Sequence, residues 1–561
     1  MLAAQRKTLR AIPLLRPENR FHALSFCGRL QIGACIVACG YGLIIILTMS
    51  RLKKFTRSLI SGYILLAANI IYTLVSVPLA LHYLGKVQFG LWAVITQLGG
   101  YIALIDLGMN SSIARILIDH KDDRVNGFYG SVIKTGALVG VVQGALILLA
   151  GISLSAPTAL LLKVPAELRH DFIWIMIGQS FLIAISFAAR LFNQLLFAHQ
   201  RLDIGNYGST ISTILCLALI WLGFVRGYGI YSFLIGQTVL ILAALVVNLA
   251  GCVRLRLLPA AGEWGTLSFM QFRELFAYGQ GVFLISVGSQ FINTSQTILI
   301  ARLLGLEAAA TWTICTRAYT IITMVVWRIM DYSSPALSEM FVRKERGRLL
   351  ERIRDLAVLM AGLSVVCGTL FATGNSSFVK VWTSAAAGWP EINNILLAFW
   401  FLACSIMRVH AGLVGISKEL HFLRFIYLIE GSVFIVLNLL AYRIENMTLM
   451  LAVSLGSTLC FTLPYGLIRT RKYFELSWAE LLGWLRPTWR LAWRLLTVAL
   501  TTWWLAQPLP ARWQLVLDLF VPGVAGTLFF LRYGLESRLR LEISEKLPPL
   551  AQLAIKRLVC P

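Results

Sequence analysis

Charged residues are scarce in this chain of 561 residues. They make up 14% of it, against 58% hydrophobic residues, whereas a soluble globular protein carries about 25% charged residues. In water such a chain would expose much apolar surface, which disfavours a soluble enzyme, a secreted disulfide scaffold and a disordered protein. Strand-like alternation of polar and apolar residues is also lacking, because the apolar runs are continuous over about 20 residues, and this disfavours a transmembrane barrel. The composition predicts an all-α polytopic membrane protein.

Acidic residues are few as well. The chain has 26 Asp and Glu against 50 Lys and Arg, a net charge of +24. A long soluble basic segment is lacking, so the excess charge favours cytoplasmic loops that face anionic lipid, and we expect no nucleic-acid partner. The ten cysteines contain no CxxC pair, so the sequence predicts neither a metal site nor a disulfide.

Catalytic motifs are lacking. The sequence has no HExxH motif, no P-loop and no paired carboxylates, and no predicted outside loop exceeds about 20 residues, too few for the active site of a membrane-embedded polysaccharide polymerase or ligase. We therefore expect no enzyme activity, no intrinsic ATP hydrolysis and no cofactor.

Apolar runs long enough to cross a bilayer recur along the chain. The first six lie at 59–81, 88–107, 132–153, 172–194, 206–225 and 229–252. The next six lie at 279–301, 308–329, 357–375, 391–410, 421–442 and 447–468, and the last two at 491–507 and 513–531. The sequence thus predicts about 14 transmembrane helices joined by short connections.

The distribution of Lys and Arg predicts the orientation. From residue 51 on, 33 of these residues fall in the even-numbered connections and the two flanking segments, and 8 fall in the odd-numbered connections. Basic residues accumulate on the cytoplasmic side. The prediction is a multi-pass protein of the bacterial inner membrane with both termini in the cytoplasm.

The first 48 residues fit this plan poorly. A basic stretch precedes an apolar run at 33–48, which imitates a signal peptide but lacks a small-residue cleavage site. A further span here would place Arg51, Lys53, Lys54 and Arg57 outside, against the positive-inside rule. We treat 1–48 as a doubtful N-terminal extension and expect translation to begin at Met49; the alternative is a genuine extra span.

One segment of the chain recurs 220 residues later. LGKVQFGLWAVIT (84–96) aligns with LGLEAAATWTICT (304–316). The identical pairs are Leu84 and Leu304, Gly85 and Gly305, Trp92 and Trp312, and Thr96 and Thr316. The same offset superposes the first two spans on the seventh and eighth, which predicts two six-helix bundles related by a parallel repeat.

The repeat divides the chain into segments. The predicted bundles occupy 49–252 and 279–468, and a cytoplasmic linker at 253–278 joins them. Residues 469–561 then form an amphipathic linker, two accessory C-terminal helices and a basic cytoplasmic tail. A cavity between two such halves, open alternately to each face, is a common transporter design.

Residues 58–115 resemble the opening of bacterial polysaccharide flippases, which belong to the multidrug/oligosaccharidyl-lipid/polysaccharide (MOP) exporter superfamily. The features that carry the resemblance are LG-x3-FGLWA at Leu84 to Ala93 and DLG-x5-AR at Asp106 to Arg115. The segment PALSEMFVRKERGRL (335–349) is also similar, and the resemblance covers about residues 50–470. It marks Asp106 and Arg115 as positions that fold a cytoplasmic gate.

The resemblance implies a flippase for an O-antigen or exopolysaccharide repeat unit. Such a protein would carry an undecaprenyl-pyrophosphate-linked oligosaccharide from the cytoplasmic to the periplasmic leaflet. The implied partners are this lipid-linked substrate, membrane lipids, and the polysaccharide polymerase and chain-length machinery.

Two charged residues fall near the middle of predicted spans. Arg317 and Glu430 each lie about ten residues inside a span, where charges are costly and therefore candidates for function. A guanidinium binds oxyanions through a bidentate fork, so Arg317 is a candidate donor to the pyrophosphate or to an acidic sugar. The alternative is a structural ion pair between Arg317 and Glu430. Glu430 is also a candidate for proton coupling.

Further candidates lie closer to the span ends. If they face the cavity, they form a basic mouth that attracts an anionic headgroup; if not, they anchor the protein at the lipid interface. These residues are Lys134, Arg190, Arg328, Arg408 and His410, with Asp106 and Asp331. Arg328 and Asp331 could instead form an i,i+3 helix pair. Asn69 and Asn293, in spans one and seven, could line a sugar path or make interhelical hydrogen bonds.

Rival functions would require different charged residues inside the spans. A drug exporter of the same superfamily, driven by cation antiport, uses carboxylates inside its bundles, whereas spans 59–81 and 279–301 contain no Asp or Glu. Lipid II flipping would share the same chemistry.

The segment 341–354 is expected to lie on the inner leaflet as an amphipathic helix. We expect alternating access driven by the proton-motive force or the membrane potential.

Overall fold

The computed structural model describes residues 23–120, 127–384, 387–417, 421–440, 446–535 and residue 540. The chain divides into two compact units, 1–63 and 64–561. All described residues of the first unit are helical and belong to α1 (Ala23–Ile102), which continues into the second unit. Residues 1–22 of the doubtful extension lie outside the described residues. Translation from Met49 therefore stays a prediction.

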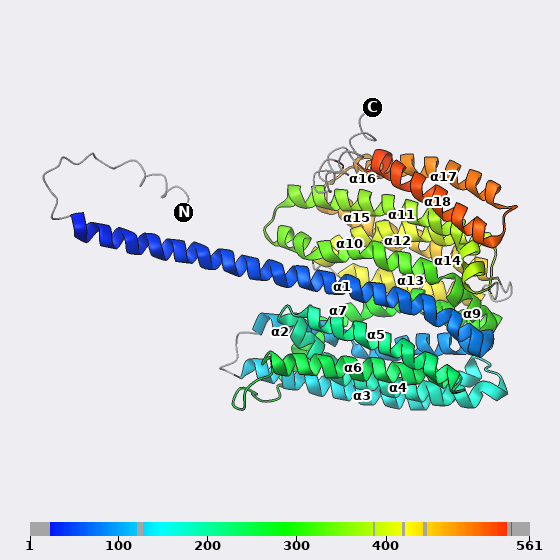
Figure 1. Cartoon of the computed structure of the whole chain (residues 1–561), viewed down its shortest axis with the longest axis horizontal. Coiled ribbons are helices and arrows are strands. Elements are labelled where there is room, and N and C mark those ends of the chain that lie inside the picture. Colours follow the sequence, from blue (N-terminus) through cyan, green and yellow to red (C-terminus); the bar gives the residue numbers. More distant parts are fainter. Residues whose placement is uncertain are drawn as a thin grey trace. The chain divides into compact units, whose positions relative to one another are not determined.

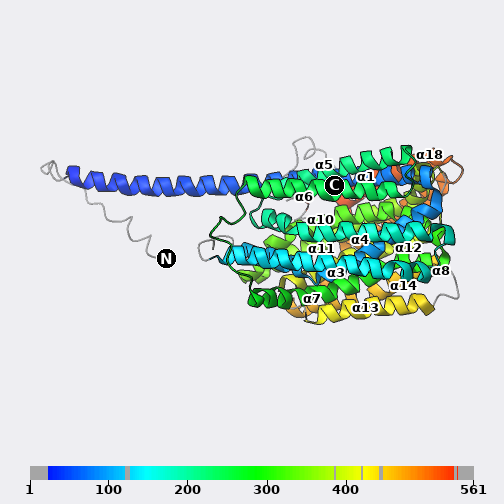
Figure 2. The same ribbon diagram turned by 90° about the horizontal axis from the view of Figure 1, so that it is seen from below.

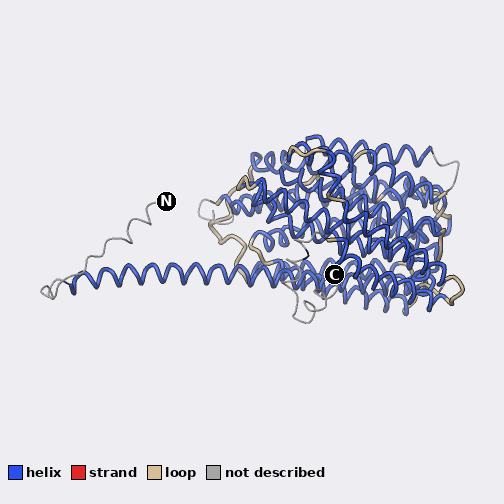
Figure 3. Tube along the Cα trace, turned by 90° about the horizontal axis from the view of Figure 1, so that it is seen from above, coloured by secondary structure: helices blue, strands red, loops and turns tan. Residues whose placement is uncertain are grey.

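In the second unit, every described element is a helix (Figure 3). After α1 come η1 (Ala103–Asp106), α2 (Met109–His120), α3 (Phe128–Leu161), α4 (Ala166–Ala198), α5 (Leu202–Val225) and α6 (Tyr231–Arg254). They are followed by α7 (Phe269–Asn293), α8 (Ser295–Leu304), α9 (Leu306–Cys315), α10 (Arg317–Val342), α11 (Arg346–Trp382), α12 (Glu391–Ser417) and α13 (His421–Leu440). The last are α14 (Met447–Cys460), α15 (Thr462–Phe474), α16 (Trp478–Gly483), α17 (Arg486–Ala506), α18 (Ala511–Phe529) and η3 (Phe530–Gly534).

Each of the 14 predicted spans overlaps one or more of these helices. By length and apolar composition, 10 described helices are able to cross a membrane, or 11 if the bent pair α7–α8 is one span. The count is lower than the prediction because α1 holds two predicted spans, and because α9–α10 and α17 do not meet the apolar criterion. The structure agrees with an all-α polytopic membrane protein of about 14 helices.

The repeated segments have the same local structure. Gly85 kinks α1 with φ 70° and ψ −178°, and Gly305 separates α8 from α9 with φ 92° and ψ 172°. This backbone region is open essentially to glycine alone. Eleven residues after each glycine, a threonine donates a hydrogen bond to the tryptophan carbonyl one turn earlier, at 2.9 Å for Thr96 and 2.7 Å for Thr316. The resemblance between the two segments thus extends from residue identity to conformation.

The helices of the second unit form two groups. Figure 1 shows α3–α6 on one side and α10–α18 on the other, with α7 between them, and Figure 2 shows most of these helices running nearly parallel. We call α1 (from residue 64) to α6 the first half, α7–α15 the second half, and α17–α18 the accessory hairpin. Direct bonds join the halves: the Trp382 indole donates to the Leu74 carbonyl (2.8 Å), and Gln290 donates to the Gly100 carbonyl (3.3 Å).

The linker between the halves is shorter than predicted, because α7 begins at Phe269 and leaves only residues 255–268 outside a helix. This linker lies against the start of α3. The Tyr129 hydroxyl donates to the Leu257 carbonyl (2.9 Å), and the Lys134 ammonium donates to the Gly265 carbonyl (2.9 Å). Gly130 permits the approach, since a Cβ there would collide with the linker backbone at Glu263. The linker is therefore fixed to the first half.

The prediction of an amphipathic surface helix at 341–354 is wrong. The segment is instead the end of α10, a short turn and the start of α11. Leu349 and Ile353 have no exposed surface and pack in a core with Leu481 and Trp484, which come from α16 and the residue after it. The apolar side of this segment faces protein rather than lipid. Residues 541–561 of the predicted basic tail lie outside the described residues.

Candidate functional site

Arg317 lies between the two halves. It begins α10, directly after the break at Thr316 that ends α9, and it lies near Tyr72 of α1. Tyr72 in turn contacts Cys216 of α5. Among the described residues, no carboxylate pairs with Arg317, and its buried Nε has no hydrogen-bond partner. The guanidinium therefore stands without a counter-ion in the helical interior.

Glu430 does not neutralise Arg317 in the described structure. Its carboxylate is 1% exposed and accepts hydrogen bonds from the Thr458 hydroxyl and from the Thr462 backbone N–H, both at 3.1 Å. Thr462 is the first residue of α15, so the carboxylate caps the positive end of a helix dipole. This contact replaces the ion pair considered above. A role of Glu430 in proton coupling stays a prediction.

A cavity of about 430 Å³ lies within the second half. Its walls come from α7, α10, α12, α13, α14 and α15, and four predicted site residues line it: Asn293, Asp331, Arg408 and Glu430. Arg408 pairs with Asp331 at 2.6 Å, and its guanidinium carbon lies 4.7 Å from the centre of the Trp327 ring. The lining thus has two carboxylates and one guanidinium, which is not the basic mouth that the sequence suggests.

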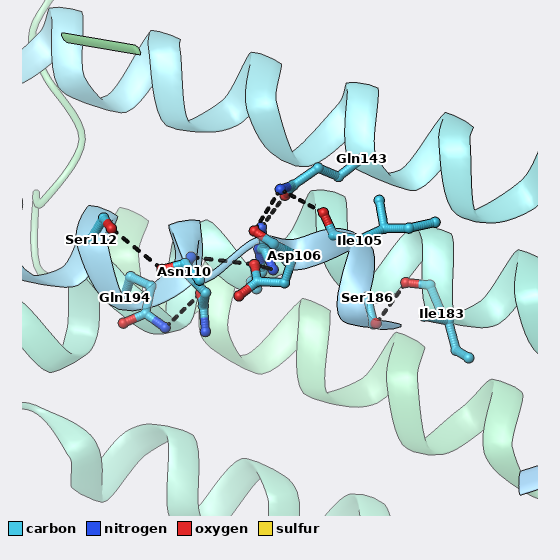
Figure 4. A network of polar contacts seen from close by, with 10 residues as sticks. Ile105, Asp106, Asn110, Ser112, Gln143, Ile183, Ser186 and Gln194 are labelled. Atoms are coloured by element: carbon cyan, nitrogen blue, oxygen red, sulfur yellow. Dashed lines mark hydrogen bonds and ion pairs between the residues drawn. The ribbon is translucent and has the colours of Figure 1, made fainter. Parts of the chain in front are cut away.

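The helix break after η1 is held by a polar network (Figure 4). Asp106 forms an ion pair with Arg190 of α4, and Arg190 also donates to the Gln143 side chain of α3. Gln143 donates to the carbonyls of Ile105 (3.1 Å) and Asp106 (2.8 Å). Asn110, at the start of α2, donates its backbone N–H to Asp106 (3.3 Å). Arg190 is therefore engaged within the first half. We call Asp106, Arg190 and Gln143 the clasp.

The clasp lies next to a contact between the halves. The chain leaves the helix at Leu107 and Gly108, both with positive φ, and a Cβ on Gly108 would collide with the Gly279 backbone of α7. Arg115, the other position marked by the resemblance, has a side chain outside the described residues.

The other predicted residues are dispersed. Lys134 binds the linker, as described above. His410 is 2% exposed, contacts the Thr470 hydroxyl through Nδ1 (2.9 Å) and stacks on Trp484. Arg328 is exposed on α10, and Asp331 pairs with Arg408 rather than with it. Asn69 is half-buried in α1 and is not among the residues that line the cavity around Asn293.

Sequence reasoning missed the partners of these charges. Gln143 stands inside an apolar run and could have been noted by the same rule that selected the other polar residues. Tyr72 and Thr462 carry no such signal, because a hydroxyl in a span is common and a backbone N–H leaves no trace in the sequence.

The comparisons with known proteins agree with this architecture. The sequence model of the family described as "Polysaccharide biosynthesis protein" matches residues 57–341. No curated protein sequence matches the chain. Among solved structures, the lipid II flippase MurJ in an inward closed conformation superposes with a TM-score of 0.58 at 11% identity, over 85% of this chain and 99% of MurJ.

Two MATE transporters are also similar in fold. The Vibrio cholerae MATE transporter VcmN in the bent form gives a TM-score of 0.51 at 15% identity, over 75% of this chain and 97% of that one. The MATE multidrug transporter DinF-BH in complex with R6G gives 0.50 at 15% identity, over 76% and 96%. With a family match over half of its residues and a fold shared with MurJ and these transporters, the chain belongs to the polysaccharide biosynthesis protein family of multi-pass membrane proteins.

Proposed function

We propose that this protein is a flippase for surface polysaccharide biosynthesis. It moves an undecaprenyl-pyrophosphate-linked oligosaccharide from the cytoplasmic to the periplasmic leaflet of the bacterial inner membrane by alternating access, with both of its termini in the cytoplasm. The observation that carries the proposal is Arg317, a guanidinium between the halves that has no carboxylate partner among the described residues.

The electrostatics of Arg317 favour an anionic substrate. A cation in the membrane interior is costly unless a counter-ion or hydrogen-bond acceptors compensate it. The diphosphate of a lipid-linked sugar offers oxyanions that match the planar guanidinium fork. Substrate binding would supply the missing negative charge, and release would remove it again.

The contacts between the halves support alternating access. A Cβ on Gly90 would collide with the Leu306 backbone near one end of the helices, and a Cβ on Gly108 would collide with the Gly279 backbone near the other. Backbone thus meets backbone at both ends. Opening toward either side requires only the contact at that end to separate, which is the geometry that alternating access needs.

The test uses a deletion strain whose missing surface polysaccharide identifies the glycan. Arg317→Ala should fail to restore this polysaccharide although the protein is present in the membrane at its normal amount, and Arg317→Lys should restore part of it. Arg226→Ala, which removes an exposed arginine at the end of α5, serves as the control and should restore it fully. Normal export by Arg317→Ala would contradict the proposal.

A second candidate is a cation-coupled exporter of small molecules. The observation that favours it is the cavity of the second half, whose walls carry Asp331 and Glu430 against one guanidinium. A related fold belongs to a multidrug transporter solved with R6G. If this candidate is right, cells that express the chain will extrude this dye, and Asp331→Asn will stop the efflux while polysaccharide export is untouched.

Energy coupling and partners follow from the proposal. A flippase without an ATP site draws on the proton-motive force or the membrane potential, so export should stop when an uncoupler collapses both. The polysaccharide polymerase and the chain-length machinery would receive the substrate on the periplasmic side.

A further inference from the structure

One end of the accessory hairpin is rich in arginine. Arg486, Arg490 and Arg494 lie on the first turns of α17, and Arg532 lies in η3 at the end of α18. Two of them meet at one aromatic ring: the guanidinium carbons of Arg494 and Arg532 lie 4.0 Å and 5.5 Å from the centre of the Tyr533 ring. We call these four arginines and Tyr533 the arginine patch.

The arginines of the patch lack a carboxylate partner within the part of the chain that the structure describes. Among the described residues, none of the four arginines forms an ion pair with a carboxylate. The one acid of the accessory hairpin, Asp518, lies on α18 several turns away and accepts a hydrogen bond from Ser377 at 3.0 Å. Beside the patch, Arg540 donates to the carbonyls of Arg532 (2.6 Å) and Leu535 (3.1 Å), and within it Arg494 donates to the Arg490 carbonyl (2.8 Å). With respect to the described residues, the positive charge of the patch is therefore not neutralised.

The surroundings of the patch are those of a lipid interface. Trp489 and Trp493, one turn apart on α17, are each 69% exposed, whereas Leu491 and Leu495 on the other side of the helix are buried. Tryptophan prefers the depth of the lipid headgroups, where its ring is in an apolar layer and its N–H is near water. The exposed side of α17 thus carries indoles and guanidinium groups at one level, which fits the depth of the lipid headgroups.

We propose that the arginine patch binds the headgroup of an anionic phospholipid with two phosphates, of the cardiolipin class. The end of the hairpin that bears it is the one that the Lys and Arg distribution assigns to the cytoplasm, where anionic lipids attract basic groups. Arg490 and Arg494 lie one turn apart, and the guanidinium groups of Arg494 and Arg532 both contact the ring of Tyr533. Two phosphates engage such a spread of guanidinium groups better than one phosphate does. This site is separate from Arg317 and does not depend on the proposed transport activity.

The experiment measures lipid binding by the purified full-length chain. The variant Arg490→Gln/Arg494→Gln/Arg532→Gln is compared with the wild type for retention of added cardiolipin, phosphatidylglycerol and phosphatidylcholine by native mass spectrometry. Each arginine near an anionic surface contributes about 1 kcal/mol, so the loss of three should weaken cardiolipin binding about a hundredfold. Phosphatidylglycerol should bind more weakly to the wild type, and phosphatidylcholine should be unaffected.

Two matched variants separate the patch from general effects. Arg512→Gln removes an exposed arginine at the opposite end of the same hairpin and should leave cardiolipin binding unchanged. Arg490→Lys/Arg494→Lys/Arg532→Lys keeps the charge and should keep most of the binding, which shows that losses in the glutamine variant are not due to misfolding. The proposal is overturned if the glutamine variant retains cardiolipin like the wild type, if Arg512→Gln weakens binding equally, or if farnesyl diphosphate binds the patch and cardiolipin does not.

Discussion

The clasp of Asp106, Arg190 and Gln143 allows a quantitative prediction. The side chains of Arg190 and Asp106 are 14% and 25% exposed, so their ion pair is largely buried. Removing one partner of a buried pair costs about 3–5 kcal/mol, because the other charge is left without compensation. Here Gln143 still bonds Arg190 after Asp106→Asn, so we expect the lower cost of about 2 kcal/mol.

The assay is thermal unfolding of the purified protein in detergent. For a chain of 561 residues, a loss of about 2 kcal/mol corresponds to a fall of about 2 °C in the unfolding temperature. Arg190→Gln should have a similar effect. The double variant should be no less stable than either single variant, since a pair that is already broken cannot be broken again.

An exposed pair provides the control. Glu339 and Arg343 form an i,i+4 ion pair with side chains 62% and 64% exposed, and Glu339→Gln should change the stability by no more than about 0.5 kcal/mol. If Asp106→Asn has as small an effect, or if the effects of Asp106→Asn and Arg190→Gln simply add, the ion pair does not stabilise the helix break and the reasoning is refuted.

Three further predictions concern the backbone and one surface helix. Gly85→Ala and Gly305→Ala should each destabilise the protein by about 1 kcal/mol or more because both glycines have positive φ. The control is Gly262→Ala, because Gly262 does not have positive φ and a Cβ there meets no neighbouring atom. If the first two variants are as stable as Gly262→Ala, the prediction is contradicted. Gly130→Leu should displace the linker from α3 and speed proteolysis within 255–268, whereas Gly347→Leu, which meets nothing, should not. Glu480 accepts hydrogen bonds from the backbone N–H and the hydroxyl of Ser477 in a capping box at α16, and these bonds lower its pKa. The stability that Glu480 adds is therefore present above the ordinary glutamate pKa of about 4.3 and is lost as the pH falls below it, so the difference in unfolding temperature between wild type and Glu480→Gln should vanish in acid.

The sequence was sufficient for the membrane class and for the approximate positions of the spans. Long apolar runs are a local signal, and the match of Gly85 with Gly305 marks a backbone geometry that few other residues adopt. The breaks within spans were harder to predict from the sequence. The break at Thr316 has no glycine or proline beside it. The break at Phe461 comes three residues before Pro464, which cannot donate a hydrogen bond to the Cys460 carbonyl, but this signal was not used.

The partners of the charged residues were not predictable from the sequence. Asp106 and Arg190 are 84 positions apart and meet only because α4 packs beside the helix break. Glu430 is bound by an amide and a hydroxyl rather than by an arginine. A guanidinium or carboxylate inside a span indicates that compensation is needed, but the residue that compensates depends on the tertiary fold.

The docking of residues 255–268 on α3 changes where the chain can bend. A loose connection between two transporter halves would absorb their relative motion outside the bilayer. Here the connection is fastened to Tyr129, Gly130 and Lys134, and α7 follows it at once. The proposed motion of one half against the other would therefore bend the chain along α7 itself. A peptide tag inserted into this short loop would disturb the proposed transport, whereas a tag in an undocked loop would not.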